Sequence, residues 1–498
     1  MMRALIAVLL ACFAASVTAE RAPDLVLRGA LTGKDQHTYR EVPFDVPKGT
    51  TRITIDVDYT GRDEKTTIDL GLLGPTGFTG QDGFRGWSGG SKRRFTVSAT
   101  DATASFLPGA IETGKWRLLL GIPNIRPASA ATFTAQVWLS HDDEGFGPEH
   151  GLSATLNPEA RWYRGDLHMH TAHSDGGCPN ASGTKKVPCP LFLTVASAAK
   201  RGLDFIAISE HNTMSQVSEM RELQPYFDTM LMIPAREITT FEGHANLFGV
   251  SRPLDFRVGS ASVPDWNALL ADVTKAHGLI SINHPRRPND ETCMGCGFTP
   301  HNVVDMRGFQ AIEAINGGDA ERPDSGIPFW EAQIDAGLRI TAIGGSDSHD
   351  GSDAPRDRFA GRIGSPTTVV HAPDLSMEGI LDGIRAGHVF IDVEGTRDRS
   401  LDVQATTGTT MAAMGDALTV TTGGSVHVLV RTAALGRQYL RVTDNGKPVD
   451  MEGHNVIPSN GEVTFDWSSD GKPHWLRVDV RSPEGKLLIL GNPIYINH

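Results

Sequence analysis

The chain has 498 residues, a length typical of about three domains. Its hydrophobic content of 39% and charged content of 21% are ordinary for a globular protein with a sizeable core. The net charge of −13 argues against a nucleic-acid partner, because nucleic-acid binders use a basic surface to release counterions. After the N-terminus no stretch approaches the ~18 apolar residues of a spanning helix, so we expect no transmembrane segment.

The first residues have the pattern of an export signal. Arg3 precedes the apolar run 4–13, and the small residues Val-Thr-Ala that end at Ala19 are typical of a signal peptidase site. We therefore expect a signal peptide, residues 1–19, that is cleaved after Ala19, and a periplasmic or secreted protein. The segment Leu-Leu-Ala-Cys ending at Cys12 also resembles a lipobox, so lipoprotein processing is an alternative. A buried first strand is a further alternative.

Four cysteines remain in the chain after the expected cleavage site: Cys178, Cys189, Cys293 and Cys296. An even number of cysteines in an oxidising compartment favours two disulfides. A structural zinc site built from all four is the alternative, because the Cys-x-x-Cys pair has the spacing of half such a site. We favour the pairs Cys178–Cys189 and Cys293–Cys296, since each closes a local loop.

Residues 20–150 have the pattern of an all-β region. Segment 51–59 alternates apolar and polar residues, and 116–120 and 132–139 are further strand-like runs between Gly- and Pro-rich turns. Helical periodicity is scarce here. The pattern predicts an N-terminal β-sandwich.

Residues 155–396 show apolar strands that alternate with helices. We expect strands at 162–168, 203–209, 231–238, 244–250, 279–283, 311–316, 339–344 and 367–371. We expect helices at 191–201, 266–277, 329–338 and 377–386. This alternation predicts a mostly parallel sheet, and the number of units predicts a closed or nearly closed α/β barrel.

Residues 397–498 return to β patterning. Strand-like runs lie at 418–422, 425–432, 439–444, 463–467, 475–480 and 492–497. We therefore predict a C-terminal β-sandwich, so that two sandwiches flank the barrel.

Histidines and carboxylates gather at the ends of the barrel strands. The set is His168, His170, Asp175, His211, Glu237, His244, His284, Asp347 and His349. His168 and His170 point the same way in an extended segment, and the strand ends of an α/β barrel share the face that carries the active site. His244 is the exception, because it begins its strand. Burying so many ionisable groups is costly unless they are paired or bind metal, so we predict a metal cluster.

Five segments of the sequence carry a family resemblance. They are GDLHMHTAHSDG, LDFIAISEHNT, EITTFEGH, INHP and GSDSH. In order and strand context they resemble the PHP (polymerase and histidinol phosphatase) superfamily of metallohydrolases. The sandwich before the barrel and the ending GNPIYIN are similar to its CehA/McbA-type branch.

The resemblance implies a distorted (β/α)7 TIM-like barrel with two or three divalent metals. It implies a first metal at His168, His170, Glu237 and Asp347, a second bridged by Glu237 and completed by His244 and His284, and a third at Asp175, His211 and His349. The chain departs from the family at Glu210, where Asp is more usual, which puts the geometry of the third site in doubt.

The chemistry of the ligands agrees with a hydrolase. Imidazole and carboxylate ligands without thiolate suit Zn²⁺, Mn²⁺ or Fe²⁺. Glu237 can bridge two metals with its two carboxylate oxygens. A water that these metals share becomes a hydroxide nucleophile near neutral pH. We therefore predict a metal-dependent phosphoesterase. A hydrolase of carbamate or carboxylic esters and a non-catalytic metal-dependent binding protein are the alternatives.

Three further residues are candidates near the cluster. His173 could donate a proton to the leaving group or serve as a hydrogen-bonding residue. Arg286 and Arg287 follow His284, and guanidinium groups suit phosphate or carboxylate. The rim segments 176–190 and 285–301 are polar, with Phe298 their only aromatic residue. This composition favours a small-molecule ester substrate that is anionic.

Overall fold

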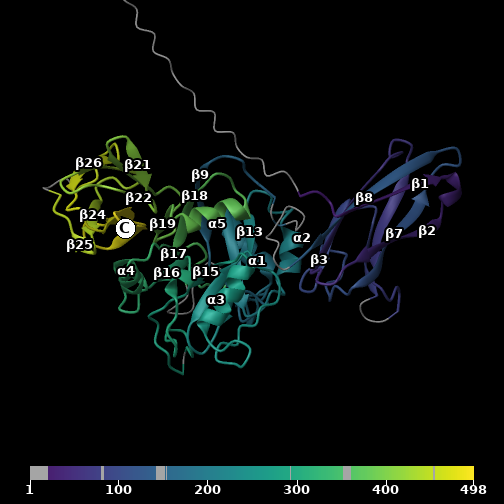
Figure 1. Cartoon of the computed structure of the whole chain (residues 1–498), viewed down its shortest axis with the longest axis horizontal. Coiled ribbons are helices and arrows are strands. Elements are labelled where there is room, and N and C mark those ends of the chain that lie inside the picture. Colours follow the sequence, from purple (N-terminus) through teal and green to yellow (C-terminus); the bar gives the residue numbers. More distant parts are fainter. Residues whose placement is uncertain are drawn as a thin grey trace, which may run out of the picture.

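The computed structural model describes residues 21–79, 83–141, 152, 154–291, 293–351, 361–451 and 455–498. Along the chain, an N-terminal β region, a central region of strands and helices, and a C-terminal β region follow one another (Figure 1). The predicted signal peptide and Cys12 lie outside the described residues. Within these residues, no helix has the length and apolar character needed to cross a bilayer.

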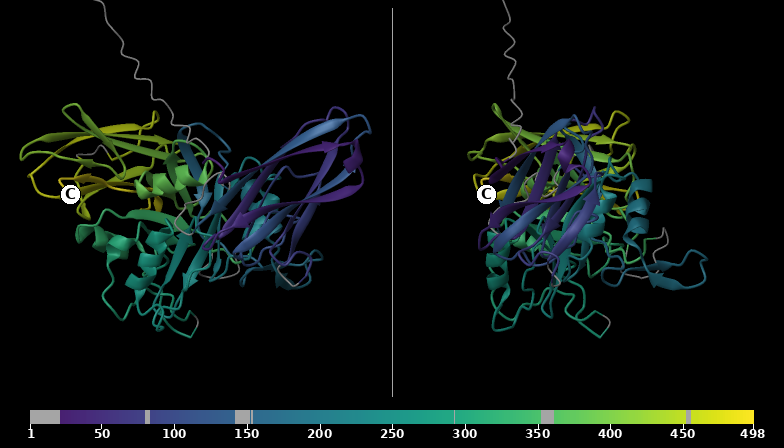
Figure 2. Two further views of the ribbon diagram at one scale, coloured as in Figure 1. Left: turned by 45° about the vertical axis from the view of Figure 1, so that its right-hand side comes forward. Right: turned by 90° about the vertical axis from the view of Figure 1, so that its right-hand side faces the viewer.

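The N-terminal region consists of two four-stranded antiparallel sheets. The first has the order β1 (Leu25–Thr32), β8 (Ala130–Ser140), β3 (Arg52–Tyr59), β6 (Arg94–Ser98), and the second β2 (Thr38–Val46), β7 (Gly114–Asn124), β4 (Thr67–Leu73), β5 (Phe84–Gly89). Alternation places apolar side chains of both sheets, such as Ile55 and Trp116, in one buried core. This region lies at the opposite end of the molecule from the C-terminal region (Figure 2).

Seven strands of the central region lie side by side in chain order. They are β9 (Arg161–Asp166), β12 (Phe205–His211), β13 (Leu231–Thr239), β14 (His244–Phe248), β15 (Leu279–Ile282), β16 (Ala311–Asn316) and β17 (Thr341–Gly345). Six run in the same direction, whereas β14 is antiparallel to both of its neighbours. The sheet is therefore mostly but not wholly parallel.

Five α-helices lie in the described part of the central region. They are α1 (Leu191–Lys200), α2 (Val217–Leu223), α3 (Trp266–Lys275), α4 (Ile327–Asp335) and α5 (Met377–Arg385). A four-residue turn joins β13 to β14, and the described residues between β15 and β16 form only the short 3-10 helix η3 (Met306–Gly308). The mixed α/β class is confirmed, but the predicted (β/α)7 repeat is corrected, since two connections lack an α-helix.

The two ends of this strand series meet at their carboxyl ends. The amide of Asp347 donates to the His168 carbonyl at 2.8 Å, and the amide of His170 donates to the Ser348 carbonyl at 2.9 Å. Thr368, in β18 (Thr367–Ala372), adds side-chain bonds to both backbone groups of Gly344. These bonds bring the segment after β9 beside the segment after β17.

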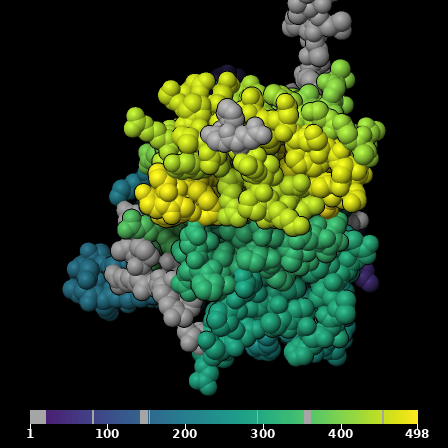
Figure 3. Space-filling view, turned by 90° about the vertical axis from the view of Figure 1, so that its left-hand side faces the viewer, coloured from purple at the N-terminus to yellow at the C-terminus, as the bar shows by residue number. Residues whose placement is uncertain are grey.

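The C-terminal region continues the central sheet. From β9 the sheet passes through β18, β19 (Val389–Asp392), β28 (Leu487–Gly491), β27 (His474–Arg481) and β24 (Tyr439–Asp444) to β25 (Lys447–Pro448), with β22 (Ala417–Leu418) and β29 (Ile494–Ile496) attached beside β27. A second sheet has the order β21 (Thr410–Ala413), β20 (Ser400–Thr407), β23 (Ser425–Ala433), β26 (Glu462–Ser468). One hydrogen-bonded sheet thus contains strands from both sides of residue 396, the predicted domain boundary. The central and C-terminal regions are in direct contact (Figure 3).

Two disulfides close local loops. Cys178–Cys189 has a Cα–Cα distance of 4.9 Å and spans the hairpin β10 (Gly177–Pro179) and β11 (Lys186–Pro188). Cys293–Cys296 has a Cα–Cα distance of 5.5 Å. The predicted pairing is confirmed, and because each sulfur has its partner, the alternative zinc site is excluded.

A buried ion cluster joins the N-terminal region to α2. The Asp101 carboxylate is fully buried and accepts hydrogen bonds from Arg52 of β3 and Arg221 of α2. Burial alone would raise the pKa of Asp101, but the two guanidinium groups hold it well below its usual range. The charge of Asp101 therefore stabilises this junction at neutral pH.

We expect Asp101→Asn to lower the free energy of unfolding by about 3 kcal/mol, because it leaves two buried cations short of their counter-charge. Since the folded pKa is depressed, the stabilisation is fully present above the unfolded pKa of ~3.9, declines as pH falls below that value, and is lost completely only as pH falls through the folded pKa. Urea unfolding measures the free energy of unfolding of both proteins. The difference between wild type and variant should be smaller below pH 4 than at pH 7. The control is Asp58→Asn, whose partner Arg62 is exposed. An equal effect of both variants would contradict this account.

Candidate metal centre

The strand arrangement places all the predicted ligand residues at one edge of the sheet. His168 and His170 follow β9, His211 ends β12 and Glu237 lies near the end of β13. His244 begins β14, but β14 runs antiparallel to its neighbours, so its first residue lies at the edge where theirs end. The one exception in the sequence pattern is therefore accounted for by strand direction.

One oxygen of the Glu237 carboxylate faces the histidines of β9. Oε2 lies 3.4 Å from Nε2 of His168 and 3.4 Å from Nε2 of His170. It also lies 3.0 Å from Nδ1 of His211. Oδ1 of Asp347 is 3.3 Å from each of the same two Nε2 atoms. Nε2 of His168 and of His170 thus faces one oxygen each of Glu237 and Asp347, and His211 adds a third imidazole beside Glu237.

The other oxygen of Glu237 faces a different pair of histidines. Oε1 lies 3.2 Å from Nδ1 of His244 and 3.2 Å from Nε2 of His284. Asn283 donates to the same oxygen at 3.0 Å. Glu237 therefore stands between two groups of candidate ligands, one on each oxygen.

A third group lies toward the surface. Oδ1 of Asp175 is 3.4 Å from Nε2 of His349 and 3.6 Å from Nε2 of His211. Asp175 is more exposed than the other carboxylates of the cluster, so this group is at the mouth of the site. The His170 ring stacks between the rings of His211 and His349.

The orientation of the imidazoles fits metal ions. Nε2 of His168, His170 and His244 is buried and has no hydrogen-bond partner among the described residues. Nδ1 of His168 lies 2.9 Å from a carboxylate oxygen of Glu313, and Nδ1 of His284 is hydrogen-bonded to the Cys296 carbonyl at 3.1 Å. When Nδ1 carries the proton in such a bond, the Nε2 lone pair remains for a metal.

The electrostatics also suit metal binding. Burial and the neighbouring His349 and His211 lower the pKa of His170 to about 3, so its ring is in the neutral form that binds metal. Burial would raise the pKa of Glu237, but the surrounding histidines hold it well below its ordinary range. Burial would lower the pKa of His168 and His349, but the neighbouring carboxylates raise that of His168 well above its usual value and that of His349 to about 9, so a metal ion would displace protons from these rings. The carboxylate and imidazole groups together are a donor set that Zn²⁺, Mn²⁺ or Fe²⁺ takes.

Two supporting carboxylates were missed by the sequence analysis. Glu313 of β16 contacts His168 Nδ1 through Oε1, and its Oε2 accepts from the His284 amide at 2.9 Å. Asp166 accepts hydrogen bonds from the amides of His168, Ser346 and Gly364. The sequence signals each of them only as an acidic residue within or at the end of an apolar strand. An acidic side chain in such a strand needs hydrogen-bond partners because it is buried.

Glu210 has a supporting role that accounts for its place in the motif. Its buried carboxylate accepts from the Thr171 amide at 3.1 Å and from the hydroxyl groups of Thr171 and Ser174. Glu210 thus fastens the loop that carries Asp175.

His173 is bonded to residues outside the predicted ligand set. Its Nδ1 lies 2.8 Å from the Ser215 hydroxyl and its Nε2 lies 3.1 Å from a Glu219 oxygen. Both ring nitrogens are engaged beside α2, which agrees with the hydrogen-bonding alternative for His173.

The two neighbouring arginines occupy different environments. Arg287 is 7% exposed; its Nη1 donates to Oδ2 of Asp347 at 2.9 Å and its Nη2 donates to Asn316. Arg286 is exposed. The predicted pair of substrate-binding cations is therefore corrected: Arg287 is already bonded to a candidate ligand, and Arg286 alone faces solvent.

The local backbone is constrained around the cluster. His284 and Asp347 adopt left-handed conformations with φ of 26° and 52°, which cost energy for residues other than glycine. At Gly345 a Cβ would lie 2.4 Å from Cβ of His168 and 2.6 Å from Oε1 of Glu313. Only glycine therefore fits beside this supported histidine.

Among the solved structures that match this chain, two are remote likenesses. One is a two-domain protein from Bacteroides vulgatus that contains a predicted PHP-like metal-dependent phosphoesterase, at 17% identity, covering 68% of this chain and 97% of that chain, with a TM-score of 0.37. The other is a mutant of xylanase 10C from Cellvibrio japonicus in complex with xylopentaose, at 9% identity, covering 60% and 54%, with a TM-score of 0.15. No family model and no curated protein matches the chain. At these TM-scores neither likeness assigns an activity.

We expect Gly345→Ala to reduce the metal content of the purified protein by at least half, because the added methyl group displaces His168 or Glu313. Elemental analysis measures the metal content, and a thermal melt shows whether the variant is folded. The matched control is Gly318→Ala, where a Cβ would meet no atom within 4 Å. Full metal content in Gly345→Ala would contradict the role given to this close approach.

Protein purified without chelator should contain at least two equivalents of transition metal. Glu237→Ala should lose more than one equivalent, because its two oxygens face two different groups of ligands. Asp175→Ala, at the exposed third group, should lose at most one. A wild type that binds one metal, or a Glu237→Ala variant that loses none, would exclude a cluster bridged by this residue.

Proposed function

We propose that this chain is a metal-dependent hydrolase of phosphoric esters, of PHP type by the resemblance of its motifs. The observation that supports this most is the Glu237 carboxylate, which presents one oxygen to His168 and His170 and the other to His244 and His284. Such an arrangement suits two metal ions that share a carboxylate. A non-catalytic binding protein has no need of this bridge.

The resemblance implies three ligand sets, which the distances support in part. His168, His170, Asp347 and Oε2 of Glu237 would hold one ion. His244, His284 and Oε1 of Glu237 would hold the second, and Asp175, His211 and His349 the third. Bound ions of this kind act as Lewis acids toward an ester oxygen and lower the pKa of a water to near neutrality.

The chain's own supporting residues fix the geometry for this chemistry. Arg287 takes Oδ2 of Asp347, so Oδ1 remains directed at the histidines. Glu313 and the Cys296 carbonyl hold the Nδ1 side of His168 and His284, which directs each Nε2 into the cluster. Preorganised ligands of this type lose little free energy to rearrangement when the charge of the transition state develops.

One observation favours a second candidate, a hydrolase of carbamate or carboxylic esters. A phosphodiester keeps a negative charge that benefits from a cation beyond the metals, and Arg287 is already engaged with Asp347. The remaining cation beside the ligands in sequence is the exposed Arg286. A neutral ester would need neither.

We further propose that the protein works in the periplasm or outside the cell. The two disulfides support this, because such bonds persist in oxidising compartments. A hydrolysis screen of phosphomonoesters, phosphodiesters, carboxylic esters and carbamates, with Mn²⁺- and Zn²⁺-loaded protein, decides between the two ester classes. No turnover of any ester would favour the binding protein instead.

Replacing Arg286 and replacing Arg287 by alanine should affect kcat/KM differently. Arg287→Ala should lower kcat/KM by ~10²-fold or more on every ester, about 2.7 kcal/mol, because it frees Asp347. Arg286→Ala should lower kcat/KM about 10-fold on a phosphodiester and leave a neutral ester unchanged, since its exposed charge is screened. Steady-state kinetics on both esters measure this. Equal losses from Arg286→Ala on both would count against a phosphoesterase.

A further inference from the structure

Two large apolar side chains stand exposed on loops next in sequence to His244 and His284. Phe241 is 89% exposed and Met294 is 72% exposed. Single exposed apolar residues are ordinary, whereas neighbouring ones beside a polar site mark a surface that contacts something. We name Phe241 and Met294 the apolar lip.

The two residues lie on loops that touch. A Cβ at Gly295, which follows Met294, would come within 2.2 Å of the Thr240 carbonyl oxygen and 2.9 Å of the Phe241 Cα. Gly295 has φ of 79°, so it also needs the conformational freedom of glycine. The loop closed by the Cys293–Cys296 disulfide therefore lies directly against the turn between β13 and β14.

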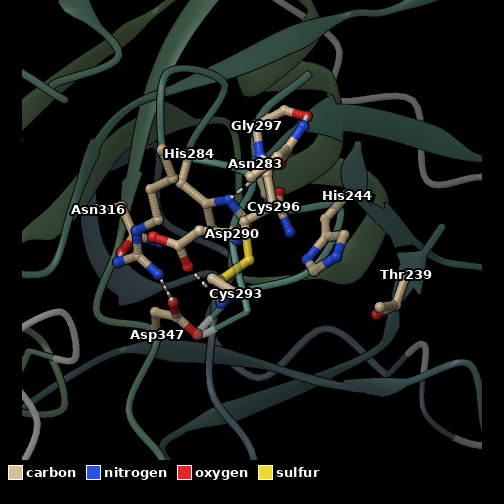
Figure 4. Close-up of a disulfide and its surroundings, with 12 residues drawn as sticks. Thr239, His244, Asn283, His284, Asp290, Cys293, Cys296, Gly297, Asn316 and Asp347 are labelled. Carbon is tan, nitrogen blue, oxygen red and sulfur yellow. Dashed lines mark hydrogen bonds and ion pairs between the residues drawn. A yellow bond between two sulfur atoms is a disulfide. The ribbon is translucent and has the colours of Figure 1, made fainter. Parts of the chain in front are cut away.

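Both loops are fastened to the Oε1 half of the cluster. The turn that carries Phe241 connects Glu237 to His244, and Thr239 pairs with His244 at its base. The other loop contributes the Cys296 carbonyl that bonds His284 Nδ1. Figure 4 shows the disulfide with His244, His284 and Asp347 around it. The two loops that carry the apolar lip are thus attached to the half of the site that His244 and His284 form.

The lip is not needed to hold the loops in place. The buried Phe298 serves that purpose, since its ring lies 5.3 Å from the Trp266 ring and a Cβ at Gly243 would meet it at 2.6 Å. Glu242 also bonds the His301 amide and ring. Phe241 and Met294 project from a scaffold that other residues already secure.

We propose that the apolar lip binds the organic group of the ester substrate, and that the preferred substrates carry an aryl group or an alkyl chain of about four or more carbons. This rests on the hydrolase function proposed above. Two side chains are too few for a protein partner, which needs about 800 Å² on each side. Methionine is flexible and polarisable, so a lip of Met and Phe accommodates several shapes.

Binding of methylphosphonate and hexylphosphonate to the Mn²⁺-loaded protein tests the proposal. Their carbon–phosphorus bond is not an ester, so calorimetry measures affinity without turnover. Wild type should bind hexylphosphonate about 30-fold tighter, as expected when five methylene groups are about half buried. The difference should carry a negative heat-capacity change, the marker of apolar burial.

The double variant Phe241→Ala/Met294→Ala should reduce this preference to about 3-fold or less. The matched control is Phe78→Ala/Met411→Ala, which removes side chains that are 66% and 65% exposed in the N- and C-terminal regions. The control should keep the wild-type preference. An equal affinity of wild type for both phosphonates, or an undiminished preference in the lip variant, overturns the proposal.

A failure of the phosphoesterase function would look different. Wild type would then bind neither phosphonate, and the same comparison is made with acetate and heptanoate, the acid products of the carboxylic-ester alternative. These also differ by five methylene groups. Tighter binding of heptanoate than of acetate that depends on Phe241 and Met294 would support the role of the apolar lip. Equal binding of the two acids would overturn that role as well.

Discussion

The burial of one carboxylate among histidines is the constraint on which the rest of the site depends. Glu237 is 1% exposed and lies within 3.4 Å of ring nitrogens on both of its oxygens. Taking such a charge out of water costs several kcal/mol unless charge and hydrogen bonds compensate. The surrounding imidazoles compensate only in part, and three of them keep a buried nitrogen without a partner among the described residues. Metal cations would satisfy both needs, so the cluster is best understood as built for its ions.

The irregularities of the central sheet serve this carboxylate. A regular (β/α) unit would place a helix between Glu237 and His244 and separate them by many more residues. Instead a tight turn reverses the chain, and β14 runs antiparallel so that His244 returns to the same edge. The departure from the predicted barrel is thus a feature of the site.

The ligand residues could be predicted because each signal is local. His168 and His170 stand two apart at a strand end, and the motif of Asp347 and His349 follows another strand. The supporting residues could not be predicted in the same way. Glu313 acts on His168 from 145 positions away, and Asp166 bonds the amide of Gly364 from 198 positions away. Which carboxylate meets which histidine depends on strand order and direction, neither of which is written in a local pattern.

Contacts between distant residues also change what can be inferred about the substrate. From the sequence, Arg286 and Arg287 are two adjacent cations beside His284, and the rim segments contain only one aromatic residue. In the fold, Arg287 turns inward to Asp347 and Phe298 is buried under the loops. Phe241, from a turn outside both rim segments, is exposed beside Met294 instead. Burial removes one cation from the mouth and the turn adds an apolar side chain, so the proposed recognition rests less on charge and more on the organic part of the proposed ester. Metal ions would then be the main source of positive charge for the reacting group.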